Sequence, residues 1–181
     1  PKNIFKAYDI RGIYDHELNN KTVKLIAKAL SAIYKNKNDK IVIGRDGRLS
    51  SETLSNTLIE GFLESGKDII DIGQVPTPLL YYAVNYFKLN SGIIITGSHN
   101  PKDYNGFKMM LGHGPFFGQD IKDMAKTPYN RTKIIEGGQQ IQLDIQDAYL
   151  HRVLDGLSLD TELSIVWDCG NGVAGPVIDK L

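Results

Sequence analysis

Two kinds of apolar pattern alternate along the first hundred positions of the chain. Short apolar runs predict β-strands at Ile41–Gly44, Ile69–Ile72 and Ile93–Ile95. Apolar residues three and four positions apart predict helices before and between these strands: Thr22–Tyr34, a helix capped by Ser50 or Ser51, and Leu79–Phe87. Because strands and helices alternate over short connections, we expect an α/β fold, with a mixed, mostly parallel sheet sandwiched by helices.

Weaker patterns extend this unit at both ends. Strands are predicted at Ile4–Tyr8 and Gly106–Leu111, and a short helix at Gln119–Lys126, with a loop of glycine, proline and aromatic residues over 112–118 and a polar stretch over 127–142. A helix over Asp144–Leu157 then precedes an apolar strand at Leu163–Asp168. We expect residues 1–143 to form one domain. Residues 144–181 would supply a linker helix and the incomplete beginning of a similar second domain.

The loops after the predicted strands are the expected places for chemistry, because ligands of open α/β sheets bind at the carboxyl ends of the strands. The loop after the third strand reads Thr-Gly-Ser-His-Asn-Pro and presents Ser98 beside His99. A hydroxyl becomes an effective nucleophile when a neighbour takes its proton or a cation stabilises its charge. Lys108 is a candidate cation, since the turn-forming Asn-Gly pair at 105–106 could fold it back towards Ser98. The alternative is an ordinary polar turn with a surface lysine.

Other polar residues near these loops have competing interpretations. Arg11 could contact an anion, or it could form a surface ion pair with Asp9 or Asp15. For the two arginines and the aspartate of residues 45–48, a salt bridge that stabilises the turn is the favoured interpretation. Three histidines lie in no motif and are interpreted as surface or structural residues: His16, His113 and His151.

A different class of function is suggested near the end of the sequence. Gly170, Gly172 and Gly175 form a Gly-x-Gly-x-x-Gly motif after the strand predicted at Leu163–Asp168. A strand, this motif and a helix together are typical of a dinucleotide-binding turn. The acidic residue expected about 20 positions later would lie beyond Leu181, so this alternative stays open.

Composition narrows the possible partners and the compartment. The 21 Lys and Arg residues balance the 21 Asp and Glu residues, so binding to nucleic acid by general electrostatics is disfavoured. Residues 1–50 carry eleven basic and five acidic residues, an excess that could assist anion binding or solvate a helix face. A single cysteine, Cys169, excludes an intrachain disulfide and favours a cytoplasmic location. No apolar run approaches the ~20 residues of a membrane-spanning helix, so no membrane partner is expected.

Five short motifs stand in order along the chain: Tyr8–Gly12, Gly44–Arg48, Val75–Pro78, Thr96–Lys108 and Asp168–Gly172. Together they resemble the α-D-phosphohexomutase family, and more closely its bacterial phosphomannomutase/phosphoglucomutase branch. The resemblance covers most of the chain, and five ordered motifs are more specific than any one alone.

The resemblance implies an isomerase reaction and roles for individual residues. Ser98 would carry a phosphoryl group, donate it to a mannose or glucose monophosphate to form a bisphosphate, and take back the other phosphate. Mg²⁺ would bind an oxygen of the Ser98 phosphate. Arg11, Lys108 and His99 would neutralise the charge of the transferred group. Lys108 or His99 would also act as general acid/base, and Tyr8 would shape the substrate site.

The resemblance also implies parts that these 181 residues do not contain. The family has four domains, and its Asp-rich metal-binding loop, its sugar-selecting loop and its C-terminal phosphate-binding domain do not occur in this sequence. We therefore expect an N-terminal fragment that is inactive alone, whose partners are a hexose phosphate and the remaining domains of the same polypeptide. A phosphoglucosamine mutase is the nearer alternative, and a dinucleotide-binding module that uses Gly170, Gly172 and Gly175 is the more distant one.

Overall fold

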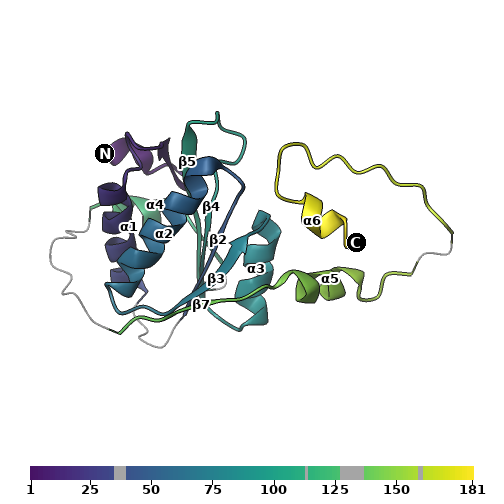
Figure 1. The fold of residues 1–181 in the computed structure, drawn as a ribbon. Helices are drawn as coiled ribbons and strands as arrows, with labels where there is room; N and C mark the ends of the chain where they lie inside the picture. The colour runs from purple at the N-terminus through teal and green to yellow at the C-terminus, as the bar shows by residue number, and fades with distance from the viewer. Residues whose placement is uncertain (35–39, 113, 127–136, 159–160) are drawn as a thin grey trace.

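A central sheet with helices on both faces organises the computed structural model, which describes residues 1–34, 40–112, 114–126, 137–158 and 161–181 (Figure 1). Its strands are β1 (Ile10–Ile13), β2 (Ile41–Arg45), β3 (Ile69–Gln74), β4 (Ser91–Ile95), β5 (Tyr104–Leu111), β6 (Gly114–Phe116) and β7 (Gln140–Gln142). Its helices are a 3₁₀ helix at Lys2–Ile4, α1 (Asn20–Ile33), α2 (Leu49–Leu63), α3 (Thr77–Tyr86), α4 (Gln119–Met124), α5 (Gln146–Leu154) and α6 (Gly175–Ile178).

The sheet is mixed, as the sequence predicts. The strand order is β1-β5-β4-β2-β3-β7, with β6 paired to β5. The pairs β4–β2, β2–β3 and β3–β7 are parallel, because a helix or longer segment returns the chain to the same edge before each new strand. The pairs β1–β5, β4–β5 and β5–β6 are antiparallel. The sheet therefore combines a parallel half with an antiparallel half, and β4 stands at the junction.

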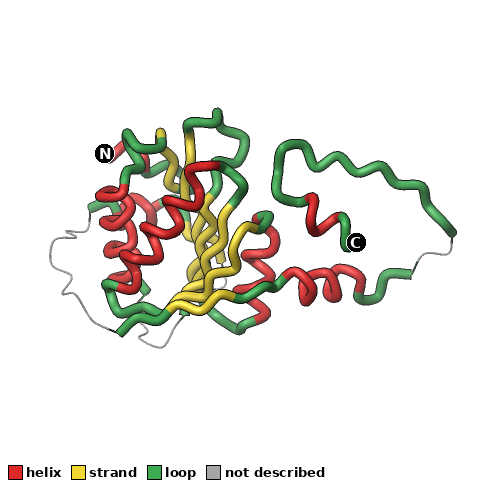
Figure 2. Tube along the Cα trace, in the orientation of Figure 1, coloured by secondary structure: helices red, strands yellow, loops and turns green. Residues whose placement is uncertain are grey.

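Helices lie on both faces of the sheet (Figure 2). The two faces carry separate apolar layers, and alternate residues of each central strand enter different layers. Ile41 and Ile43 of β2 pack with α1 and α2, whereas Val42 packs with α3 on the opposite face. Successive side chains of a strand point to opposite faces of the sheet. This alternation explains why the central strands are apolar at nearly every position, since both of their faces are covered by helices.

The strand predicted at Ile4–Tyr8 is wrong. The chain instead forms the 3₁₀ helix and a turn in which the Lys6 amide donates to the Asp9 carbonyl, and β1 begins only at Ile10. Phe5 makes an isolated bridge to Ile10. A strand needs a paired neighbour, and β5 supplies one only from Ile10 onward.

The predicted cap of α2 is also wrong. The helix begins at Leu49, with Arg48 at its N-cap position and no side-chain cap. Ser50 and Ser51 lie buried inside the first turn, and both of their hydroxyls accept hydrogen bonds from the side-chain nitrogen Nδ2 of Asn105. These serines therefore join α2 to β5 instead of capping the helix.

The strand predicted at Leu163–Asp168 is not formed within the described residues. The segment is exposed and makes no strand pairing, because the described residues offer no open sheet beside it. The chain then turns back: Val177 of α6 joins Ile145 and Leu150 in the layer around α3, and the Lys180 ammonium lies 2.8 Å from Asp147.

Besides β1, two strands were not predicted. β6 lies within the loop expected over 112–118, and β7 within the polar stretch expected over 127–142, of which residues 127–136 are outside the described residues. In the part of the chain that the structure describes, no helix has the length and apolar character needed to cross a membrane.

Candidate active site

Three loops meet at the carboxyl ends of the parallel strands. The Asp46 amide, just after β2, donates to the carbonyl of Ile95 at the end of β4 over 2.8 Å. The Val75 amide, after β3, donates to the carbonyl of Arg45 over 2.9 Å. The loops at 45–48, 75–78 and 96–101 are thus neighbours, because parallel strands end at the same edge of a sheet.

Ser98 stands at the tip of the third loop in an unusual backbone conformation. Its φ is +51°, a left-handed value that costs a residue other than glycine on the order of 1 kcal/mol or more. The Ser98 amide donates to the Thr96 hydroxyl over 3.0 Å, and the Asn100 amide donates to the Gly97 carbonyl over 3.1 Å. Ser98 and His99 are both exposed, and Ser98 Oγ lies 3.3 Å from His99 Nδ1. The loop therefore presents a hydroxyl to solvent with an imidazole beside it.

Arg11 lies under this loop. Its predicted ion pair with Asp9 is present, but it is not at the surface. Its side chain is only 7% exposed, and its guanidinium donates to the Thr96 carbonyl and to the Asp9 carboxylate. The same carboxylate faces the Lys108 ammonium, with 3.6 Å between Asp9 Oδ2 and Lys108 Nζ. Asp9 therefore lies between two cations at the edge of the Ser98 loop.

The sheet register explains how Arg11 and Lys108 come together. Ile10 of β1 is paired with Phe107 of β5, and both enter the layer of α1 and α2. Arg11 and Lys108, one residue further along each strand, therefore face the opposite side of the sheet. Gly106, which pairs with Arg11, has no room for a side chain, since a Cβ there would lie 2.1 Å from the Ile10 carbonyl oxygen.

The route predicted for Lys108 is wrong, although Lys108 does lie near the loop. The Asn-Gly pair at 105–106 is not a turn but part of β5. The chain reverses earlier, in the Ser98 loop, where the Tyr104 amide donates to the Pro101 carbonyl. Antiparallel pairing with β4 then places Lys108 opposite Ile94.

Arg48 has a role that the sequence interpretation missed. Its Nη1 donates to the carbonyls of Pro101 (2.6 Å) and Tyr104 (3.0 Å), and its Nη2 to those of Ser98 (3.1 Å) and Asn100 (2.6 Å). The predicted salt bridge within the turn is present as well, with 3.6 Å between Arg48 Nε and Asp46 Oδ2. The sequence held no signal for the four carbonyl contacts, because backbone acceptors some 50 positions away carry no residue pattern.

Aromatic residues lie beside the Asp9 segment. Tyr8 is 76% exposed and stacks on Phe117, with 6.4 Å between the ring centroids. Phe117 was not predicted as a site residue. Of the histidines interpreted as surface or structural, His16 and His151 are exposed, and His113 lies outside the described residues.

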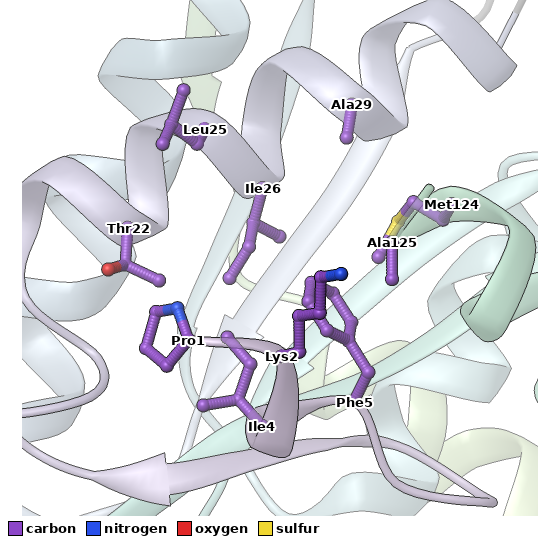
Figure 3. A pocket seen from close by; sticks show the side chains of 10 residues that line it. All are labelled: Pro1, Lys2, Ile4, Phe5, Thr22, Leu25, Ile26, Ala29, Met124 and Ala125. Atoms are coloured by element: carbon purple, nitrogen blue, oxygen red, sulfur yellow. The ribbon is translucent and has the colours of Figure 1, made fainter. Parts of the chain in front are cut away.

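Two other features do not join the site. A mainly apolar pocket opens between the 3₁₀ helix, α1 and α4, and Figure 3 shows Ile4, Ile26 and Met124 among its lining side chains. It contains none of the predicted site residues. The glycine motif at 170–175 follows an unpaired segment and opens a four-residue helix, so the strand of a dinucleotide-binding turn is missing among the described residues.

The described residues contain no group of three or more His, Cys, Asp or Glu side chains placed to hold a metal ion. The donor set at the Ser98 loop is an exposed hydroxyl, an imidazole and a lysine. The two nearby carboxylates are already engaged: Asp9 is paired to Arg11 and Lys108, and Asp46 accepts from the Gly97 amide and lies beside Arg48. Such a set is suited to an anionic group and supplies few of the oxygen ligands that a hard cation requires.

Comparison with known proteins agrees with this fold. Residues 2–134 match the family model described as phosphoglucomutase/phosphomannomutase, alpha/beta/alpha domain I. The chain belongs to the phosphoglucomutase/phosphomannomutase family.

Individual relatives extend the similarity over the whole chain. A phosphomannomutase/phosphoglucomutase of Pseudomonas syringae is 38% identical over 100% of this chain, and a phosphoglucomutase of Neisseria meningitidis is 40% identical over 99%. A crystal structure of a family protein from Burkholderia thailandensis, 36% identical, superposes with a TM-score of 0.88 over 99% of this chain and 41% of its own. The chain spans about two fifths of the length of these relatives, 39% and 40% for the first two.

Proposed function

We propose that this chain is the phosphoserine-bearing part of a phosphohexomutase that interconverts the 1-phospho and 6-phospho forms of mannose and glucose. The observation that carries the proposal is the exposed Ser98 hydroxyl, on a left-handed turn, beside His99 and next to the Arg11–Asp9–Lys108 cluster. The activities for which the relatives are named, phosphomannomutase/phosphoglucomutase and phosphoglucomutase, support the same reaction class.

The reaction would be a phosphoryl transfer in two halves. A sugar hydroxyl oxygen attacks the phosphorus on Ser98, so that a bond from this oxygen to phosphorus forms and the bond from Ser98 Oγ to phosphorus breaks. The sugar bisphosphate then turns over, and Ser98 Oγ attacks the other phosphate. In each half a general base takes the proton of the attacking hydroxyl, and the same group returns a proton to the leaving oxygen.

His99 and Lys108 are the two candidates for this proton transfer. His99 Nδ1 lies 3.3 Å from Ser98 Oγ. Lys108 is paired with Asp9 instead, with 3.6 Å between Lys108 Nζ and Asp9 Oδ2. Phosphoryl transfer depends mainly on positioning and charge stabilisation. Arg11 would contribute to both, because its buried guanidinium supports the Thr96 carbonyl and adds positive charge below the loop.

The proposal assigns further requirements to the whole protein. Mg²⁺, when bound, would neutralise phosphate charge, and an oxygen of the Ser98 phosphate would be its ligand from this chain. The carboxylate ligands, and most contacts to the hexose phosphate, would come from the remaining domains of the polypeptide. Tyr8 would contact the sugar from this side of the site.

The test is the variant Ser98→Ala in the full-length protein. We expect it to abolish mutase turnover, because alanine has no hydroxyl oxygen to which the phosphoryl group can be bonded. Mass spectrometry of the wild-type protein should find phosphate on the peptide that contains Ser98. The matched control is Ser158→Ala, an exposed serine after α5, which should leave turnover unchanged. Normal activity of Ser98→Ala would reject the proposal.

A further inference from the structure

The guanidinium of Arg48 binds the Ser98 loop from inside. Its two terminal nitrogens donate four hydrogen bonds to the carbonyls of residues 98, 100, 101 and 104, at 2.6 to 3.1 Å. A guanidinium is a rigid planar donor, so four simultaneous bonds fix the positions of the carbonyls relative to one another. Arg48 itself is fixed, because it is the N-cap residue of α2.

Asp46 holds the other side of the same loop. Its Oδ2 accepts from the Gly97 amide over 2.9 Å and lies 3.6 Å from Arg48 Nε. Its Oδ1 accepts from the Arg48 amide over 3.0 Å and from the Ser51 hydroxyl. The backbone is therefore held on both sides of Ser98. Asp46 accepts from the amide of the preceding residue, Gly97, and Arg48 donates to the carbonyl of Ser98 itself.

The backbone of Ser98 needs such support. A left-handed φ at a residue other than glycine persists only where the surroundings hold it, and Ser98 has a φ of +51°. Gly97 is part of the same fit, because a Cβ at this position would lie 2.0 Å from Arg48 Nε. The absent side chain of Gly97 leaves the space that the guanidinium fills.

We propose that Arg48 and Asp46 are positioning residues for phosphoryl transfer: they hold the strained Ser98 loop so that the Ser98 oxygen has one fixed location. This inference rests on the proposed function for its catalytic consequence, and on the contacts alone for its structural one. Neither side chain would touch the substrate. They act through the backbone on either side of Ser98.

The structural consequence is tested by limited proteolysis of the loop with trypsin. Lys102 is exposed in the loop, and trypsin cleaves after lysine only when the backbone around it opens. In the full-length protein, we expect Arg48→Ala to speed the appearance of the fragment ending at Lys102 by about tenfold or more, since four hydrogen bonds to the loop are lost. Arg152→Ala is the matched control, because Arg152 is exposed on α5 and makes one long surface ion pair, 3.8 Å to Asp155. It should leave the cutting rate unchanged.

The catalytic consequence is tested by steady-state kinetics on the same variants. We expect Arg48→Ala to lower kcat about 100-fold, the size of effect that a misplacement of about 1 Å produces, with KM within about twofold of wild type. Arg48→Lys keeps the charge but loses the planar fork, so it should lower kcat roughly tenfold. Should Arg48→Ala fail to fold, as judged by thermal unfolding, Arg48→Lys carries both measurements.

The outcomes separate this inference from the proposed function. Faster cutting together with a lower kcat and an unchanged KM supports it. Unchanged cutting in both Arg48 variants overturns it, and so does faster cutting with an unchanged kcat. A rise in KM that accounts for the whole loss also overturns it, because Arg48 would then serve substrate binding. Retained turnover in Ser98→Ala rejects the proposed function instead, and the cutting result is unaffected.

Discussion

Asp9 is the residue on which two cations of the site depend. It is close to buried, at 13% side-chain exposure, and it pairs with Arg11, which is 7% exposed. The second partner, Lys108, is 34% exposed and lies 3.6 Å away. A buried guanidinium without its counter-charge is strongly unfavourable, because desolvation of the charge is no longer offset.

We therefore expect Asp9→Asn to destabilise the fold by about 2–4 kcal/mol, measured by urea unfolding at pH 7. The amide still accepts a hydrogen bond but carries no charge, so Arg11 stays buried with only neutral partners. Asp179→Asn, an exposed residue at the end of α6, is the control and should change stability by less than about 0.5 kcal/mol. Equal stability of the two variants would contradict a buried ion pair at Asp9.

At the residue scale, the sequence predicted which side chains lie near Ser98 but not the contacts that place them there. A cation near Ser98 was predicted from motifs, and Arg11 and Lys108 do lie together at the loop. The means by which Lys108 arrives was not predicted, because an Asn-Gly pair favours a turn in isolation while its neighbours pair as a strand. The contacts of Arg48 were hidden for a different reason: its partners are backbone carbonyls, which every residue possesses.

At the scale of elements, a charged cluster joins α1 to α2. The Lys24 ammonium on α1 lies 3.0 Å from Glu60 on α2 and 2.8 Å from Glu64, the C-cap residue of this helix. The hydrogen bond from Lys24 is the main cause that lowers the pKa of Glu64 below its ordinary value of 4.5. The same bond raises the pKa of Lys24. The two helices are thus held by charge at their surface as well as by apolar contacts below it.

This cluster makes stability depend on pH in a defined direction. Because the pKa of Glu64 is lowered in the folded state, its contribution is present above the unfolded pKa of about 4.5 and is lost as the pH falls through the folded value. We expect Glu64→Gln to cost about 0.5–1 kcal/mol at pH 7 and clearly less at about pH 3, which lies below the unfolded pKa, measured by urea unfolding at both pH values. Glu162→Gln, on an exposed segment, should show no such difference; a loss for Glu64→Gln that is independent of pH would count against the ion pair.

The elements themselves were predictable where burial decides them. Apolar runs located β2, β3 and β4, because a strand covered on both faces has little choice of composition. β7 was missed because this edge strand, Gln-Ile-Gln, is exposed and has no apolar pattern. The prediction for Leu163–Asp168 was wrong for the opposite reason. This segment has the composition of a buried strand, but no neighbour among the described residues pairs with it.

At the scale of the whole molecule, the question is where the first structural unit ends. The sequence predicts a boundary between residues 143 and 144, and the position of β7 next to β3 is compatible with it. The apolar layer around α3, however, continues beyond this point. Ile145 and Leu150 are buried in that layer, and the Tyr82 hydroxyl on α3 donates to the Ala148 carbonyl over 2.8 Å. These contacts lead us to propose that α5 belongs to the first unit.

Shortened chains decide between the two boundaries. A chain that ends at Leu143 exposes the α3 surface that Ile145 and Leu150 cover, so it should be about 2–4 kcal/mol less stable than one that ends at Leu157. A chain that ends at Leu157 loses only the contact of Val177 with this layer and should lie within about 1–2 kcal/mol of residues 1–181. Urea unfolding followed by circular dichroism measures all three. Equal stability of the chains ending at 143 and 157 would favour the boundary after residue 143. Helix α5 would then be a linker that contacts the first unit but does not contribute to its free energy of unfolding.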